Sequence, residues 1–245
     1  MLWLLIFLGL ALVWTTFMFT TVGVVGNSNR PTLVNEQRLF VPKYEYWLRQ
    51  AGMASLNRGD FVALKPPLGT PNATATIPLI NLPFRAFFIK RVIAVPGDEV
   101  SVREGIVYLN GKALQENYIS SDIKRDTDSY PILCYEHSKL TSISTQMGRF
   151  DVEDLPEYMR DTQRMLVAPK TLAKNEDGES CGVGSLKLEP GYYFVMGDNR
   201  EFGGSLDSRS FGPIYQKAIA GRGIAVFTND LVSKVTRLET PAAFQ

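Results

Sequence analysis

Histidine is nearly absent from this sequence, since His137 is the only one among 245 residues. Zinc sites of the His-Glu-x-x-His type need two histidines on one helix face, so that class of metalloprotease is excluded. A Ser-His-Asp triad would have to use His137, which lies in a polar stretch far from any nucleophile-like motif. If the chain catalyses hydrolysis, we therefore expect a base other than histidine.

Cysteine is also scarce, with only Cys134 and Cys181. Two cysteines cannot form a structural zinc site by themselves, and we expect neither a metal nor a cofactor. In an oxidising compartment the two would be able to form one disulfide. Two unpaired buried thiols are the alternative, and the sequence does not decide between them.

The chain has almost no net charge, because 26 Lys and Arg face 25 Asp and Glu. This balance gives no electrostatic reason to expect a nucleic-acid partner. Hydrophobic residues make up 45% of the chain, which is enough for a sizeable core.

Charged side chains are missing altogether from residues 1–25. An apolar run of this length predicts a transmembrane anchor. A cleaved signal peptide is the alternative, but the run is long, begins without basic residues and has no Ala-x-Ala site at its end. The first basic residue is Arg30, so the positive-inside rule places the body in the cytoplasm, against the function that the motifs below favour.

The segment 87–98 carries a lysine where a strand should be apolar. Its pattern predicts a buried strand closed by the turn Pro96-Gly97-Asp98, with Lys90 inside it. Burying an ammonium group is expensive, so a lysine that reaches solvent or pairs with a carboxylate is one interpretation. The other is a lysine whose pKa is lowered by an apolar pocket until it can serve as a general base.

The remaining pattern predicts a mostly β, barrel-like fold, because short apolar segments alternate with Gly-Asp turns. We expect a β core in residues 26–112 and 189–232. Residues 113–188 are polar, low in strand signal and hold both cysteines, so we interpret them as an inserted α+β cap. Residues 233–245 are expected to be a polar C-terminal tail.

Four segments, in order, carry a family resemblance: Ser28 with Pro31-Thr32-Leu33; Arg58-Gly59-Asp60; Lys90-Arg91 with Pro96-Gly97-Asp98; and Gly197-Asp198-Asn199-Arg200 with Ser205, Asp207-Ser208-Arg209 and Gly212. Behind an N-terminal apolar segment, they resemble the type I signal peptidases, which remove signal peptides from exported preproteins. The resemblance covers the anchor and the two β blocks but not residues 113–188.

The resemblance implies a membrane-anchored serine endopeptidase with a Ser/Lys dyad. Ser28 would be the nucleophile, its backbone N–H an oxyanion donor, and Lys90 the general base. Ser205 would orient the lysine amine by a hydrogen bond. The supporting residues would be Asp207 paired with Arg209, Asp198 bracing the loop with Arg200, and Arg91.

The same resemblance implies the partners and the location. The substrates would be preproteins with small residues at the cleavage site, met at the lipid bilayer. The catalytic domain would lie on the outer, periplasmic face of a bacterial inner membrane.

The sequence departs from the family pattern next to the nucleophile. Asn29 stands where methionine is usual, Gly26 cannot supply a side-chain donor to the oxyanion, and Gly203-Gly204 lengthens the approach to Ser205. These departures favour a member dedicated to one secretion or conjugation apparatus. A non-catalytic, membrane-tethered module that keeps the fold is the alternative.

Overall fold

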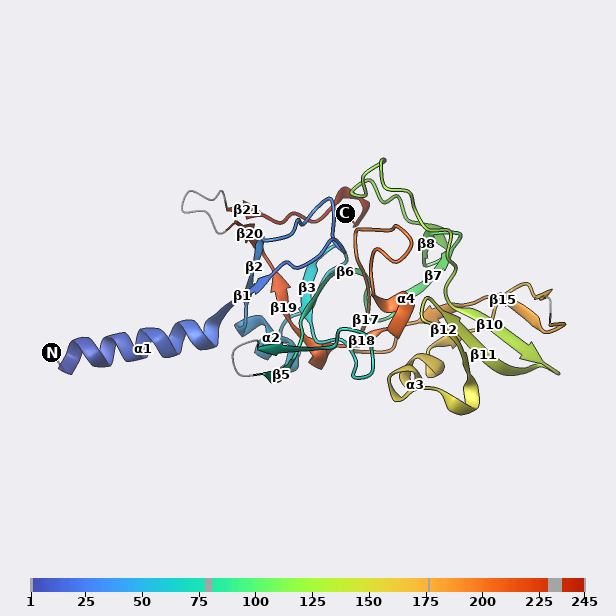
Figure 1. Cartoon of the computed structure of the whole chain (residues 1–245), viewed down its shortest axis with the longest axis horizontal. Helices are drawn as coiled ribbons and strands as arrows, with labels where there is room; N and C mark the ends of the chain where they lie inside the picture. The colour runs from blue at the N-terminus through green and yellow to red at the C-terminus, as the bar shows by residue number, and fades with distance from the viewer. Residues whose placement is uncertain (1, 78–80, 176, 229–234, 245) are drawn as a thin grey trace.

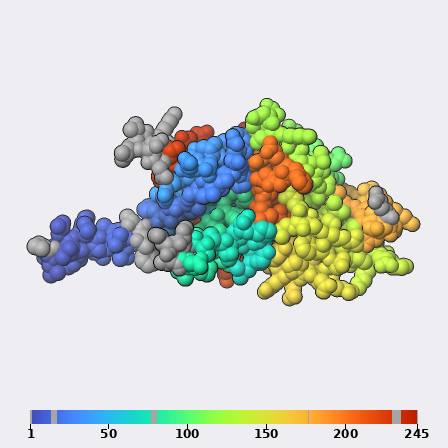
Figure 2. Space-filling view, viewed as in Figure 1, coloured from blue at the N-terminus to red at the C-terminus, as the bar shows by residue number. Residues whose placement is uncertain are grey.

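The computed structural model describes residues 2–77, 81–175, 177–228 and 235–244. The fold is mostly β, as the sequence predicts, and the described strands form antiparallel pairs in several sheets (Figure 1). Helix α1 (Leu2–Met18) extends from one end of the body, and a sheet built around β10 and β11 forms the opposite end (Figures 1 and 2).

The central sheet holds the segment with the unusual lysine. The predicted strand is β6, and it ends at the predicted turn, where the Val95 N–H donates to the Asp98 carboxylate. Six of its seven residues are buried, including Lys90 and Arg91. The order of the sheet is β18 (Ile214–Tyr215), β17 (Tyr192–Met196), β6 (Phe88–Ala94), β3 (Phe61–Leu64) and β19 (Ile219–Gly223).

A second sheet carries the N-terminal part of the body. Its first strand, β1, is an edge strand because it pairs only with β2. Helix α2 (Tyr44–Gln50) follows β2, and the hairpin β4 (Thr74–Ile77) and β5 (Leu82–Arg85) lies further along the chain. The sheet order is β1 (Phe19–Gly23), β2 (Arg38–Pro42), β20 (Ala225–Phe227) and β21 (Thr236–Arg237).

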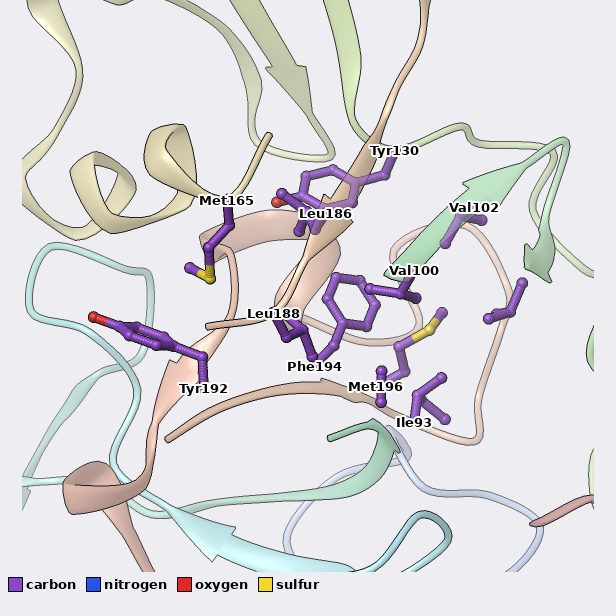
Figure 3. Close-up of a cluster of buried hydrophobic side chains, with 12 residues drawn as sticks. Ile93, Val100, Val102, Tyr130, Met165, Leu186, Leu188, Tyr192, Phe194 and Met196 are labelled. Carbon is purple, nitrogen blue, oxygen red and sulfur yellow. The ribbon is translucent and has the colours of Figure 1, made fainter. Parts of the chain in front are cut away.

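A third sheet packs the largest apolar cluster against the central one (Figure 3). The rings of Tyr130 and Phe194 lie 5.8 Å apart in this cluster. Asn110-Gly111 makes the hairpin turn between β8 and β9. The sheet order is β13 (Leu166–Val167), β16 (Ser185–Lys187), β7 (Glu99–Arg103), β8 (Ile106–Leu109) and β9 (Lys112–Ala113).

The segment between β9 and β17 is richer in strands than its polar sequence indicates. Cys134 and Cys181 face each other across β10 and β15 and form a disulfide. Helix α3 (Glu157–Arg164) packs on this sheet through Met159. The sheet order is β12 (Gly148–Asp151), β11 (Lys139–Thr145), β10 (Ile132–Glu136), β15 (Ser180–Val183) and β14 (Ala173–Lys174).

Short helical turns complete the described chain: η1 (Val152–Asp154), α4 (Ser208–Phe211), η2 (Gln216–Ala218) and η3 (Ala242–Phe244). In η3 the ring of Phe244 stacks on Tyr118 at 5.6 Å, so this part of the expected tail packs on the body. The domain division stays a prediction, and its boundary at residues 232 and 233 lies outside the described residues.

The transmembrane anchor expected over residues 1–25 stays a prediction, but its helix ends earlier than the apolar run does. Helix α1 stops at Met18, because residues 19–23 form β1 and pair with β2 in five register positions. Among the described residues, no helix combines the length and the apolar character needed to span a membrane.

Candidate active site

A cavity of about 990 Å³ brings Ser28 and Lys90 together. Its walls come from the end of β1 and the segment after it, from α2, from the β4–β5 hairpin and from the start of β6. The two residues lie 62 positions apart in the sequence, and the structure places both side chains at one hollow.

Lys90 is buried without a partner. Only 3% of the residue is exposed, and within the described residues its Nζ has no hydrogen bond or ion pair. The centroid of the Phe88 ring lies 5.6 Å from Nζ. Burial lowers the pKa of Lys90 from 10.5 to about 8, although the charges of Asp207 and Asp198 act to raise it.

The loop that carries Ser28 is fastened on two sides. The Ser28 carbonyl accepts a hydrogen bond from the Asn199 N–H at 3.1 Å. The buried side chain of Asn29 donates through Nδ2 to the Ile89 carbonyl at 2.8 Å, immediately before Lys90. Asn29 therefore ties the serine loop to the lysine strand, a role that its polarity alone did not reveal. Its Oδ1 is buried and has no hydrogen-bond partner in the described chain.

Gly197 allows a close approach at the same place. A Cβ on this residue would overlap the Ser28 carbonyl oxygen and the Ser205 hydroxyl, so both lie against the glycine backbone. Ser205 Oγ is buried but makes no hydrogen bond in the part of the chain that the structure describes. The expected hydrogen bond from Ser205 to Lys90 is therefore not formed here.

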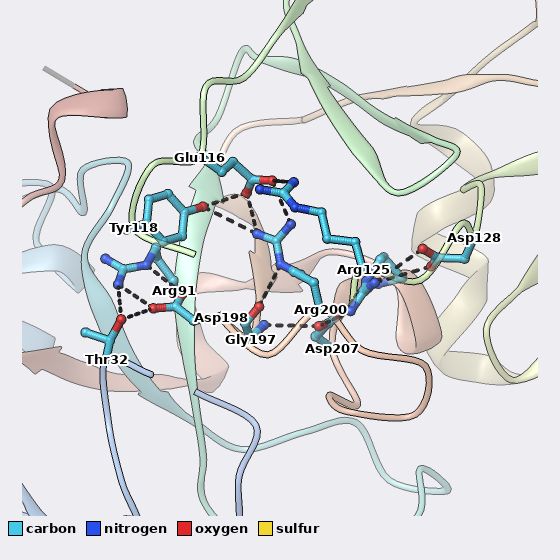
Figure 4. Close-up of polar contacts among 11 residues, drawn as sticks. Thr32, Arg91, Glu116, Tyr118, Arg125, Asp128, Gly197, Asp198, Arg200 and Asp207 are labelled. Atoms are coloured by element: carbon cyan, nitrogen blue, oxygen red, sulfur yellow. Dashed lines mark hydrogen bonds and ion pairs between the residues drawn. The ribbon is translucent and has the colours of Figure 1, made fainter. Parts of the chain in front are cut away.

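Behind the cavity lies a network of buried ion pairs (Figure 4). Arg91 donates to Asp198 through Nε at 2.8 Å and through NH2 at 2.6 Å, and Thr32 donates to the same carboxylate at 2.5 Å. The Arg91 guanidinium lies 4.1 Å from the Phe61 ring centroid and 4.5 Å from that of Tyr118. Thr32 comes from the Ser28 loop, so this pair holds the loop against β6.

The expected interaction between Asp198 and Arg200 is wrong, because each of the two residues pairs with another residue. Asp198 pairs with Arg91, while Arg200 forms a bidentate pair with Glu116, with N–O distances of 2.5 and 2.9 Å. Residues two apart on a tight loop direct their side chains to different neighbours, and each finds its counter-charge on another element. Glu116 lies at the start of the expected insertion and gave no local sequence signal.

Asp207 and Arg209 form a buried pair through two hydrogen bonds of 3.0 and 2.9 Å. Burial by itself raises the pKa of Asp207, but the charge and hydrogen bonds of Arg209 outweigh it, so the pKa lies below its usual range. Asp207 also accepts the Gly197 N–H at 3.0 Å. Arg209 reaches Asp128 at 3.3 Å, a second contact from the segment that sequence reasoning set aside as an insertion.

Potential metal ligands gather at one place in the described residues, where Glu179 lies beside Cys134 and Cys181. The disulfide between the two cysteines occupies both sulfurs. This group lies in the sheet opposite α1 and not at the cavity.

Comparisons with known proteins agree on one family. The model of the family described as signal peptidase, peptidase S26, matches residues 1–228. A signal peptidase I P from Bacillus subtilis subsp. natto is 29% identical over 86% of this chain and 78% of that protein. A probable signal peptidase I-2 from Synechocystis is 36% identical over 48% of this chain, which spans about half the length of that relative.

A solved signal peptidase I from Enterococcus faecalis is also similar. It is 24% identical and covers 69% of this chain and 97% of its own, with a TM-score of 0.36.

Proposed function

The chain belongs to the signal peptidase family, peptidase S26, and is a serine endopeptidase of that family; from this premise we propose that it removes signal peptides from exported preproteins, with Ser28 as nucleophile and Lys90 as general base. The observation that carries the proposal is the buried, unpaired Lys90 at the wall of the cavity that also contains Ser28. A surface ion pair would leave the lysine protonated and unfit to accept a proton.

The proposed reaction needs only these groups and water. Neutral Lys90 takes the proton of Ser28 Oγ while the oxygen attacks the scissile carbonyl. The resulting oxyanion is stabilised by the Ser28 N–H, which makes no hydrogen bond within the described residues. The Lys90 ammonium then protonates the departing amine, and a water that gives its proton to Lys90 hydrolyses the acyl-enzyme ester.

The surrounding residues support this reaction by position. Asp207 and Arg209 lie near Lys90 with opposite effects on its pKa, so the pair adds little net charge to the lysine environment. Arg91 and Asp198 hold the Ser28 loop through Thr32. The proposed role of Ser205 is to accept a hydrogen bond from the Lys90 ammonium when substrate fills the cavity. Arg200 anchors the loop 197–209 to Glu116.

We place the enzyme at the outer face of a bacterial inner membrane, acting on preproteins with small residues at the cleavage site. Apolar side chains of α1 are widely exposed, among them Trp3 at 83% and Phe7 at 70%, and Trp47 is exposed beside the cavity. A secretion or conjugation apparatus would supply the clients. Co-flotation of the full chain with lipid vesicles tests the location, and a chain that never floats would refute it.

The central experiment is cleavage of a preprotein with a small-residue site by the detergent-solubilised chain, beside Ser28→Ala and Lys90→Ala. We expect both substitutions to reduce cleavage by about 10³-fold or more, with unchanged circular dichroism. Cleavage that persists in folded Ser28→Ala would assign the nucleophile elsewhere. If the parent itself is inactive and a serine-directed acylating inhibitor fails to label Ser28, the chain is a non-catalytic module.

A further inference from the structure

The charged residues that line the cavity are all basic. Besides Lys90, three lysines line it (Lys43, Lys65 and Lys217), and no Asp or Glu is among its described lining residues. The chain as a whole has 26 basic and 25 acidic residues, so this imbalance is local. An unbalanced cationic wall attracts anionic groups and discourages cationic ones.

Two of these lysines are neighbours at one end of the cavity. Leu64 and Ile219 are register partners in β3 and β19, and the Lys65 N–H donates to the Ala218 carbonyl at 2.9 Å. Lys65 directly follows β3, and Lys217 lies in η2, which leads into β19, so the two residues are close along the backbone. Both are exposed, and among the described residues neither takes part in an ion pair.

The position of this pair relative to the reaction centre follows from β6. Lys65 Nζ lies 5.6 Å from the ring centroid of Phe87, which lines the same cavity. Phe87 precedes Lys90 by three residues, and an extended chain rises about 3.3 Å per residue. Val62 and Leu64 of β3 are the register partners of Lys90 and Phe88, so Lys65 lies three positions, or about 10 Å, along the sheet from the partner of Lys90. An extended substrate covers this distance in about three residues.

We propose that Lys65 and Lys217 select substrates by binding a carboxylate side chain about three residues from the scissile bond, on the side that runs toward Phe87. The preferred client is a preprotein with Asp or Glu at that place. This selection rests on the proposed function, because it takes the peptide in the cavity to be the substrate. A peptide is favoured over a lipid headgroup because the pair lines the cavity that contains Ser28 and Lys90.

A measurement of peptide affinity with the Ser28→Ala chain tests this selection independently of catalysis. The Ser28→Ala chain is titrated with fluorescent peptides that contain a small-residue site and carry Glu or Gln at positions two to five on either side of it. We expect one Glu position to bind about tenfold tighter than its Gln counterpart, an advantage that shrinks as salt rises. Lys65→Gln with Lys217→Gln should remove the advantage, and Lys65→Glu with Lys217→Glu should shift it to a Lys-bearing peptide.

Lys174→Glu is the matched control, since Lys174 is an exposed residue of β14, outside the cavity. It should leave the ratio of Glu to Gln affinities unchanged. Equal affinities at every position would overturn the selection even if the parent cleaves its substrate. Loss of binding to phosphatidylglycerol vesicles in Lys65→Gln with Lys217→Gln, with no peptide preference in the parent, would assign the pair to lipid and overturn it as well.

Discussion

Lys90 and Arg91 are consecutive residues of β6, both almost fully buried, and their surroundings are opposite. Successive side chains of a strand point to opposite faces. Lys90 lies at the cavity without a counter-ion, whereas Arg91 on the other face has the Asp198 carboxylate, the Gly59 carbonyl and two aromatic rings. Burial alone thus decides neither the charge state nor the role of a basic residue, because two equally buried residues can differ in their ion-pair and hydrogen-bond partners.

The contrast also explains how the fold tolerates an unpaired buried cation. The described charges nearest to Lys90 are bound to one another, as Asp207 is to Arg209 and Asp198 to Arg91. Each carboxylate is already engaged, so neither is drawn toward the lysine to neutralise it. We call the side of β6 that carries Arg91 the paired face and the side that carries Lys90 the unpaired face. The ion pairs of the paired face stabilise the sheet, and this allows Lys90 to stay buried with a lowered pKa.

The largest effect on stability should come from breaking the paired face. Asp198→Asn removes the counter-charge of Arg91 and leaves its guanidinium buried, which should lower the free energy of unfolding by about 3–5 kcal/mol. Urea denaturation measures the loss. Arg91→Met combined with Asp198→Asn should recover part of it, since no charge is then left unpaired. A loss below about 1 kcal/mol would mean that Arg91 does not depend on its carboxylate partner, and the contrast with Lys90 would not hold.

Replacing Lys90 on the unpaired face should raise the free energy of unfolding, whereas Asp198→Asn lowers it. The pKa of Lys90 is about 8 in the folded protein and about 10.5 unfolded, so the unfolded chain binds more protons between these values and stability rises with pH there. Below pH 8 the burial penalty is fully present. Lys90→Met should therefore stabilise the protein more at pH 7 than at pH 10.5, by about 3 kcal/mol.

Paired urea titrations of Lys90→Met and the parent at the two pH values measure this difference. Leu109→Met serves as a control for introducing a methionine, because it changes no ionisable group. An equal effect of Lys90→Met at pH 7 and pH 10.5 would mean that Lys90 is not a desolvated cation.

The smallest effect is expected where an ion pair lies in solvent. Lys139 and Glu153 approach to 3.4 Å, with side chains 74% and 83% exposed. Lys139→Ala should change the free energy of unfolding by about 0.5 kcal/mol or less. The same urea titration tests it, and a loss comparable to that of Asp198→Asn would show that burial does not set the value of these pairs.

Sequence patterns correctly located strands and turns, because these features depend on residues that are close together in the sequence. The strand around Lys90, its Pro-Gly-Asp turn and the Asn110-Gly111 hairpin follow from local periodicity and turn chemistry. The family motif singled out Ser28, Lys90, Ser205, Asp207 and Arg209, and these residues gather around the cavity and Gly197. Their catalytic roles stay predictions.

Long-range partners could not be found in this way. Glu116 lies 84 residues from Arg200 and Asp198 lies 107 from Arg91, so nothing in the local pattern links them. The family resemblance implied a brace between Asp198 and Arg200, whereas each of the two residues pairs with a residue of another segment. The apolar run at the start also gave the wrong end for the helix, because pairing with β2 takes residues 19–23 into a sheet.

The hydrogen bond from Asn199 to the Ser28 carbonyl has a consequence for biosynthesis. It joins residues 171 positions apart, and β2, which follows the serine loop, pairs with β20 near residue 226. Contacts of such sequence separation form late, since a long loop must close before they stabilise anything. A ribosome-bound chain that has not yet released residue 199 thus holds Ser28 and Lys90 without the scaffold that unites them. Ser28 and Lys90 therefore reach their folded arrangement only after the residues that carry Asn199 and β20 have left the ribosome.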